Sequence, residues 1–167
     1  MTRKSSLFFL IGLILTVGLD QTVKYWVMRN IPLGTENTFL PFISLYHVHN
    51  SGVAFSFFSS FSHWGFIVIT LIIIVFLLWL WKNTGYNKPL TCCGLILIIG
   101  GAIGNLIDRI RFHYVIDYIF FHIDEIFYFA IFNLADTFIT LGVIIILIEE
   151  LHIWMKTKRR SNSTISK

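Results

Sequence analysis

Residues 64–81 read WGFIVITLIIIVFLLWLW, and this stretch decides the class of fold. It is almost purely aliphatic and aromatic, and it carries no charged side chain. A helix needs about 20 such residues to cross the hydrocarbon core of a bilayer. Trp79 and Trp81 stand at one end of the stretch, where indole rings are typical of the membrane–water interface. The stretch therefore predicts a transmembrane helix.

Three more apolar runs of similar length lie outward from this one, at about residues 7–26, 90–110 and 132–148. The first follows Arg3 and Lys4 and resembles a signal peptide, but no small-residue cleavage site follows it. We therefore interpret it as a retained span. The sequence predicts an all-α membrane protein with four transmembrane helices. Residues 1–160 are expected to form a single integral membrane domain, and residues 161–167 a disordered cytoplasmic tail.

The composition and the charge distribution agree with a membrane protein. Only 13% of the residues are charged, whereas a soluble domain carries roughly a quarter. The net charge of +4 does not favour nucleic-acid binding, because the basic residues flank apolar runs and do not form a basic face interleaved with aromatic side chains. Placing both termini and the 82–88 loop in the cytoplasm leaves 13 − 4 = 9 of the Lys and Arg residues inside, as the positive-inside rule expects.

Two segments between the spans differ from the spans in amino-acid composition. Residues 31–61 contain Pro32, Gly34, Pro41 and Gly52, and residues 42–48 are rich in β-branched and aromatic side chains. This pattern is typical of short strands, so we expect a small external β-structure there. Residues 111–131 mix Phe, Tyr and Ile with acidic residues and histidines, and we expect them to lie at the membrane surface.

The ionisable and amide residues of the spans gather at one depth. An ionisable residue inside a bilayer costs about 3 kcal/mol or more unless it is paired or hydrated, so it marks a functional site by default. With alternating topology, the following residues all fall at the outer ends of their helices: Asp20, Lys24, Asn105, Asp108, Arg109, Asn133 and Asp136. A transporter would distribute such residues through the membrane depth. The gathering therefore favours a site near the outer face over an ion or proton path.

Helical spacing refines this picture for the third span. Gly101, Asn105 and Arg109 follow one another at intervals of four and share a face. Gly100 and Gly104 form a small-xxx-small pair, which lets a second helix approach closely. We expect this span to pack tightly and to present its polar residues to a neighbouring helix. The fourth span carries a similar stripe, at Asn133, Asp136 and Thr140.

Two acidic residues, Asp117 and Asp136, are candidates for chemistry. Two carboxylates close together in a low-dielectric site share a proton. The ionised one takes a proton from water while the protonated one polarises a peptide carbonyl, as in an aspartic protease. The alternative is that Asp117 caps a surface turn and Asp136 caps the fourth helix. Asp20 and Lys24 lie four residues apart, and we expect them to pair and to fix a helix end.

A metal site is not expected. His47 and His49 alternate as two side chains on one strand face would, a spacing that can bind metal, but no third ligand is evident. We interpret them as surface or interfacial histidines. The adjacent Cys92 and Cys93 are expected to act as small apolar packing residues.

Five short motifs follow one another along almost the whole chain. They are Asp20-Gln21-x-x-Lys24, Asn50-Ser51-Gly52-Val53-Ala54-Phe55, GGAIGNLIDR at residues 100–109, Val115-Ile116-Asp117-Tyr118 and Phe132-Asn133-Leu134-Ala135-Asp136. In this order, on four spans, they resemble the lipoprotein signal peptidases (type II signal peptidases) of bacteria. Val53 stands where that family more often has Ala, and Thr137 where Ser or Ala is common, and both departures are mild.

The resemblance implies an intramembrane aspartic endopeptidase of the bacterial inner membrane that works without a cofactor. Such enzymes remove the signal peptide from a prolipoprotein, cutting just before a cysteine that carries diacylglycerol. The implied partners are prolipoproteins and membrane lipids, with no nucleic acid, and we expect a monomer. The family fold also implies a small external β-cradle and a surface helix, which suit residues 31–61.

The resemblance also implies the roles of individual residues. Asp117 and Asp136 would form the catalytic dyad. The remaining motif positions, expected to bind substrate or support the site, are Asp20, Lys24, Asn50, Gly52, Ala54, Gly101, Asn105, Arg109, Asn133 and Ala135. Among them, Asn105 and Arg109 would hold backbone carbonyls of the substrate, and Asp20 and Lys24 would support the site. By position alone, Phe55, Phe57 and Phe58 are hypothesised to pack against acyl chains.

Overall fold

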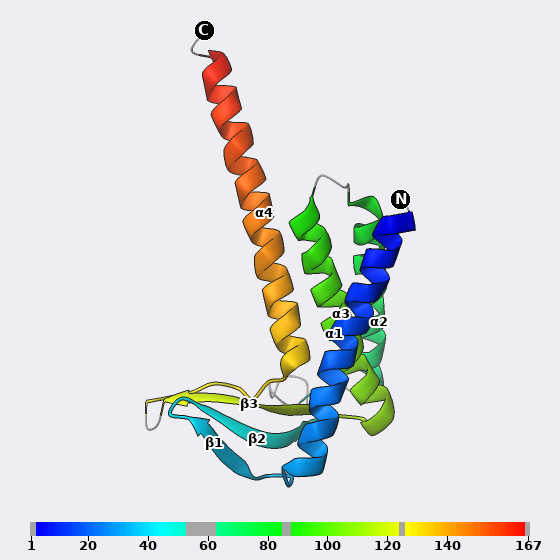
Figure 1. Cartoon of the computed structure of the whole chain (residues 1–167), viewed down its shortest axis with the longest axis vertical. Helices are drawn as coiled ribbons and strands as arrows, with labels where there is room; N and C mark the ends of the chain where they lie inside the picture. The colour runs from blue at the N-terminus through cyan, green and yellow to red at the C-terminus, as the bar shows by residue number, and fades with distance from the viewer. Residues whose placement is uncertain (1–2, 53–62, 85–87, 124–125, 166–167) are drawn as a thin grey trace.

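The computed structural model describes residues 3–52, 63–84, 88–123 and 126–165. Along the chain its elements are α1 (Arg3–Asn30), β1 (Glu36–Leu40), β2 (Ile43–Asn50), α2 (His63–Asn83), α3 (Pro89–Phe112), β3 (Val115–Ile123), β4 (Phe127–Tyr128) and α4 (Leu134–Ile165). Figure 1 shows the sheet lying across one end of the helices, while both chain termini lie at the other end. The end of α1, the end of α3 and the start of α4 therefore meet beside the sheet.

All four predicted spans are present as helices. Within the described residues, four stretches are long and apolar enough to cross a membrane: Ser6–Asn30, Trp64–Asn83, Pro89–Phe112 and Leu134–Lys158. The protein is thus a multi-pass membrane protein with four candidate spans. α4 differs from expectation, because it continues through Ile165 and includes residues 161–165 of the tail that we expected to be disordered. Residues 149–165 contain neither Gly nor Pro, so no strong helix breaker ends α4 after Glu149 and Glu150.

The central helix is α3. In its most apolar stretch 67% of the residues are buried, against 11–17% in the other three spans, and α3 contacts α1, α2 and α4. Its buried Leu95, Ile96 and Ile99 form one core with residues of α1 and α2, including Phe9 and Ile74. The other three helices turn many large apolar side chains outward, which suits contact with lipid.

Glycines let the helices approach α3 closely, as the small-xxx-small pair predicted. A Cβ atom added at Gly100 would lie 2.6 Å from Cγ2 of Thr16 on α1, and one added at Gly104 would collide with the carboxylate of Asp20. On the side facing α4, Gly94 and Gly142 meet in the same way. These contacts bring the polar ends of α1, α3 and α4 within hydrogen-bonding distance of one another.

The sheet is antiparallel, in the order β1-β2-β3-β4. Val48 on β2 pairs with Asp117 on β3, and Asn50 pairs with Val115. β1 and β2 confirm the strands predicted in residues 31–61. β3 and β4 were not predicted, because residues 111–131 were expected only to lie at the surface. The sequence of β3, VIDYIFFHI, suits a strand, but β2, the strand that pairs with it, lies far away in the sequence.

The fold class is therefore confirmed as four long apolar helices with a small antiparallel sheet. Residues 31–52 form no helix, and residues 53–62 lie outside the described part of the chain. The expected surface helix thus stays a prediction. The same holds for the expected roles of Ala54, Phe55, Phe57 and Phe58.

Candidate active site

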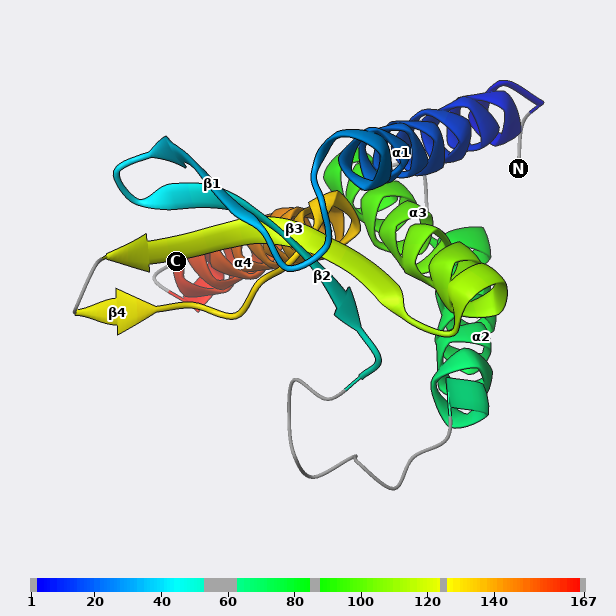
Figure 2. The same cartoon turned by 90° about the horizontal axis from the view of Figure 1, so that it is seen from below.

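Most of the side chains singled out from the sequence come from elements that meet beside the sheet, as Figure 1 and Figure 2 show for their backbones. Asp20 and Lys24 come from α1, Asn105 and Arg109 from α3, Asn50 from β2 and Asp117 from β3, while Asn133 directly precedes α4 and Asp136 is in its first turn. The site therefore depends on the packing of three helices and two strands that are far apart in the sequence.

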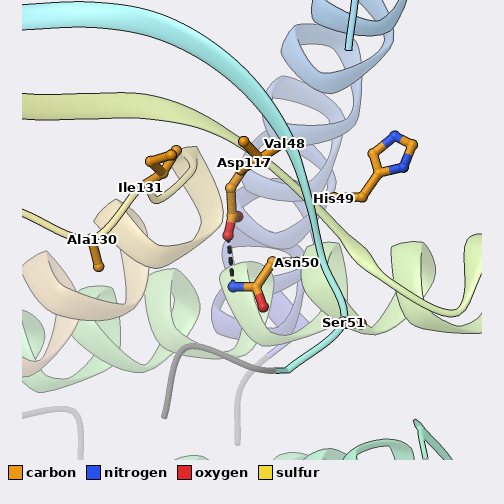
Figure 3. Close-up of a pocket in the computed structure, with 7 residues that line it drawn as sticks. All are labelled: Val48, His49, Asn50, Ser51, Asp117, Ala130 and Ile131. Atoms are coloured by element: carbon orange, nitrogen blue, oxygen red, sulfur yellow. Dashed lines mark hydrogen bonds between the residues drawn. The ribbon is translucent and has the colours of Figure 1, made fainter. Parts of the chain in front are cut away.

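Asp117 lies on β3 with a side chain that is only 1% exposed. Its Oδ2 accepts a hydrogen bond from Asn50 Nδ2 at 2.8 Å, which Figure 3 shows, and its Oδ1 accepts one from Asn133 Nδ2 at 2.7 Å. Asn50 lies two residues beyond Val48, the strand partner of Asp117, so both side chains are on one face of the sheet. Asn50 Oδ1 accepts the backbone N–H of Gly52 at 2.9 Å, which turns its NH₂ group towards Asp117.

Asp136 lies in the first turn of α4. Its Oδ2 accepts the backbone N–H of Asn133 at 3.1 Å, and Asn133 Oδ1 accepts the backbone N–H of Asp136 at 3.0 Å. This reciprocal arrangement is a capping box. Asp136 Oδ1 also accepts a hydrogen bond from Asn105 Nδ2 on α3 at 2.8 Å. The two interpretations of Asp136 are therefore compatible, because the same carboxylate caps the helix and takes part in the polar site.

Asn105 joins the two carboxylates to α1. Its Oδ1 accepts hydrogen bonds from Lys24 Nζ at 2.9 Å and from Asn133 Nδ2 at 3.1 Å. Lysine has only donors, so the NH₂ group of Asn105 must point away from Lys24, towards Asp136. Asn133 donates to Asp117, and Asn105 donates to Asp136, so the two amides connect the aspartates in one buried network.

A buried ion cluster supports this network from α1. Lys24 Nζ lies 2.9 Å from Asp20 Oδ2 and 2.7 Å from Asp108 Oδ2, and all three side chains are at most 1% exposed. The predicted pairing of Asp20 with Lys24 is confirmed. Gln21 Nε2 donates to Asp108 Oδ1 at 2.9 Å and to the carbonyl oxygen of Gly104 at 3.1 Å. The ammonium group of Lys24 thus lies between the carboxylates of Asp20 and Asp108. The side-chain amide of Gln21 further restrains the carboxylate of Asp108.

The start of α4 is held by side chains from other elements. The first N–H groups of a helix have no partner within it. Here the N–H of Leu134 donates to Tyr118 Oη at 3.1 Å, and that of Ala135 donates to Asp20 Oδ1 at 3.0 Å. The expectation that Asp20 fixes a helix end is thus correct, but the end belongs to α4.

Arg109, Gly101 and Ala135 lie around the network. The Arg109 guanidinium lies 5.5 Å from the centre of the Phe66 ring, and the charges of Asp136 and Asp117 act on it. A Cβ atom added at Gly101 would collide with the carbonyl oxygen of Ala135, which is fully buried. Gly101 and Ala135 therefore set how closely α3 and α4 pack.

Burial alters the acidity of Asp117. Removal of its carboxyl from solvent raises its pKa to about 6, although the hydrogen bonds from Asn50 and Asn133 favour the ionised form. The negative charge of Asp136 also raises this pKa. The charge of Asp136 therefore acts on Asp117, whose carboxyl holds its proton more readily than an exposed aspartate would.

Cavities reach the two aspartates from different sides. One of about 290 Å³, drawn in Figure 3, is lined by Val48, His49, Asn50, Ser51, Asp117, Ala130 and Ile131. Another, of about 300 Å³, is lined by Phe129, Phe132, Asp136, Thr137, Thr140 and Leu141. Of the predicted stripe of Asn133, Asp136 and Thr140, the last two residues line this cavity. Phe129 and Phe132 also line a separate apolar cavity of about 370 Å³.

The two histidines considered as metal ligands have other partners. The Nδ1–H of His47 donates to the carbonyl oxygen of Ile31 at 2.8 Å, and the ring of His49 stacks on Tyr114 at 3.7 Å. Among the described residues, no group of three His, Cys, Asp or Glu side chains is placed to hold a metal ion.

Three residues of the network were not among the expected site residues: Gln21, Asp108 and Tyr118. All three lie inside the motifs quoted above, and their place in these motifs was the signal in the sequence that could have marked them as site residues. Their contacts could not be read from the sequence, because each joins segments far apart in the chain: Gln21 and Asp108 are 87 positions apart, and Tyr118 and Leu134 are 16 apart.

Comparison with known proteins agrees with the fold. The lipoprotein signal peptidase of Bartonella quintana is 75% identical over 167 residues, covering both chains completely. That of Brucella ovis is 44% identical over 154 residues, covering 92% of this chain and 94% of the relative. A bacterial membrane enzyme structure obtained by the in meso method at 1.9 Å has a TM-score of 0.78 and 30% identity, and the match covers 86% of this chain and 92% of that one.

Four candidate membrane spans, together with these relatives, define the class as an aspartic peptidase of the membrane. The model of the signal peptidase (SPase) II family matches residues 12–152, and the chain belongs to that family. Its activity is that of a lipoprotein signal peptidase.

Proposed function

We propose that Asp117 and Asp136 are the catalytic dyad, and that the enzyme cuts prolipoproteins just before a diacylglyceryl-modified cysteine. The main support for this dyad is the amide network, in which the side chains of Asn133 and Asn105 connect the two carboxylates by hydrogen bonds. The relatives named lipoprotein signal peptidases support the substrate class.

The dyad would work with one shared proton. The ionised carboxylate takes a proton from a water molecule, and the water oxygen attacks the carbonyl carbon of the scissile bond. The protonated carboxyl gives its proton to the carbonyl oxygen, and a tetrahedral intermediate forms. Collapse of this intermediate breaks the C–N bond, a proton passes to the leaving amine, and the dyad again holds one proton.

The other motif residues would hold this dyad in place or bind substrate. Asn50, Asn105 and Asn133 donate to the aspartates, and Lys24 orients Asn105. Asp20 caps the helix that carries Asp136. Arg109 would bind a backbone carbonyl of the substrate. Gly52, Ala54, Gly101 and Ala135 would shape the backbone around the site.

We place both termini in the cytoplasm and the site near the outer face of the inner membrane, with residues 1–160 as one domain that acts as a monomer. The exposed Lys82, in the last turn of α2, and Lys156 and Lys158, in the C-terminal half of α4, support this orientation, because Figure 1 shows these parts of the two helices remote from the sheet. At the outer face, the site would meet a membrane-anchored substrate at the depth of its lipidated cysteine.

The test is cleavage of a diacylglyceryl-modified prolipoprotein by the purified full chain in detergent or lipid. Wild type is expected to cut before the modified cysteine, and Asp117→Asn and Asp136→Asn are each expected to be folded and inactive. Glu150→Gln, an exposed acid that pairs with Lys88 far from the site, is the matched control and should retain activity. Cleavage by either aspartate variant would refute the dyad, and cleavage of the unmodified precursor at an equal rate would refute the substrate class.

A further inference from the structure

Tyr118 is bound at two points to the segment that leads into α4. Its backbone N–H donates to the carbonyl oxygen of Phe132 at 3.0 Å, and its hydroxyl oxygen accepts the backbone N–H of Leu134 at 3.1 Å. The side chain is only 3% exposed, and its ring packs in a second core with Val27 and Ile116.

These two contacts connect the two segments of the chain that carry the aspartates. Tyr118 directly follows Asp117 on β3, and Leu134 precedes Asp136 by two residues on α4. The strand that carries one acid is therefore joined to the helix that carries the other through the Tyr118 hydroxyl and backbone groups. Asn133, which donates to Asp117 through Nδ2 and to Asp136 through its backbone N–H, makes a second connection beside it.

The hydroxyl group of Tyr118 is chemically suited to accept the backbone N–H of Leu134. The N–H of Leu134 is at the first position of α4 and has no acceptor inside the helix. Burial raises the pKa of Tyr118 well above its usual value, and the nearby carboxylates of Asp20, Asp136 and Asp117 act in the same direction. The group therefore stays a neutral hydroxyl, whose oxygen accepts the helix N–H throughout the pH range in which the enzyme is handled.

We propose that Tyr118 is a positioning residue that fixes the separation of Asp117 and Asp136 by binding the first N–H of α4. This inference rests on the dyad of the proposed function. It assigns no contact with substrate to Tyr118.

The separation of the aspartates determines how strongly they interact. Two coupled carboxylates lose their protons in two steps, and the gap between the apparent pKa values grows with the coupling. The single-proton form of a dyad is active between those two values, so weaker coupling narrows the bell-shaped pH profile. Lys24 of α1 and Arg109 of α3 also act on this pair, and they stay unchanged when the tyrosine hydroxyl is removed.

The test is Tyr118→Phe, which keeps the ring in its core and removes only the hydroxyl. Loss of this acceptor leaves the partly buried N–H of Leu134 without its partner, and we expect kcat for a diacylglyceryl-modified prolipoprotein to fall about tenfold. KM should change little, and the pH profile should narrow from both sides. Amide exchange at Leu134 should become faster.

Tyr114→Phe is the matched control, because Tyr114 precedes the same strand and contacts His49 and Phe112 through its ring. It should keep the wild-type kcat and pH profile. A wild-type profile in Tyr118→Phe would overturn the proposal, as would an equal narrowing in both variants. Activity in Asp117→Asn or Asp136→Asn would instead refute the dyad, so the two failures are distinguishable.

Discussion

Asp20 on α1 caps α4: its Oδ1 accepts the backbone N–H of Ala135 at 3.0 Å, across 115 positions of the sequence. The other oxygen of the same carboxylate pairs with Lys24. The helix end that carries Asp136 is therefore held by a buried ion cluster on a different helix. Disturbing that cluster should affect both the stability of the protein and the geometry of the dyad.

Lys24→Met should be strongly destabilising. It leaves the carboxylates of Asp20 and Asp108 buried without their cation, and removing one partner of a buried ion pair costs about 3–5 kcal/mol. Thermal unfolding in detergent measures the loss. Lys88→Met is the matched control, because its pair with Glu150 is exposed and contributes at most about 1 kcal/mol. Equal losses in the two variants would contradict this account.

Asn50→Ala should shift the pH profile of cleavage. Asn50 donates to Asp117 and so lowers the pKa of that carboxyl. Without the donor the pKa of Asp117 rises further, and the limb of the pH profile that Asp117 governs moves to higher pH. Ser51→Ala alters an exposed residue of the same cavity and should leave the profile in place. A shift to lower pH in Asn50→Ala would show that the hydrogen bond does not act in this way.

Gly101→Ala should push α4 away from α3. The new methyl group would collide with the carbonyl oxygen of Ala135, and such overpacking costs about 1–3 kcal/mol. Because α4 carries Asp136, cleavage should slow as well. Gly18→Ala is the control, since a Cβ atom there meets nothing within 4 Å, and it should be neutral or stabilise the helix by about 0.5–1 kcal/mol. A stable and fully active Gly101→Ala would disprove the close packing.

The stability of the protein should depend on pH through Asp117. Its pKa is about 6 in the folded protein and about 3.8 in the unfolded chain, so the folded form binds more protons between these values. The free energy of unfolding therefore falls as pH rises from about 4 to about 6, by at most about 3 kcal/mol. Asp117→Asn cannot titrate, and its melting temperature should fall less over the same range. Parallel pH curves for the two proteins would rule this contribution out.

The four spans and the gathering of polar groups could be predicted from the sequence because both depend on local composition. The apolar runs set the helices, and the repeated turns of α3 placed Gly101, Asn105 and Arg109 on one face. The pairing of Asp20 with Lys24 followed from their spacing of four, and the motifs pointed to Asp117 and Asp136.

The remaining features depend on contacts between distant segments. Nothing in the sequence showed that residues 115–123 pair with β2, because strand pairing is decided by a partner and not by local preference. Asp108 is the single acid of α3, and only the position of Lys24 on α1 makes it part of the ion cluster. The extension of α4 was missed because two glutamates were interpreted as the end of the helix.

The three asparagine side chains around the dyad have one further consequence. Each is turned towards a carboxylate by a group other than that carboxylate: Asn50 by the Gly52 amide, Asn133 by the Asp136 amide and Asn105 by Lys24. Their dipoles are thus oriented before any substrate arrives. In the proposed dyad, the charge would move from one aspartate to the other without any rotation of these dipoles. Such a site would have a low reorganisation energy, an advantage that water around the same two acids would not provide.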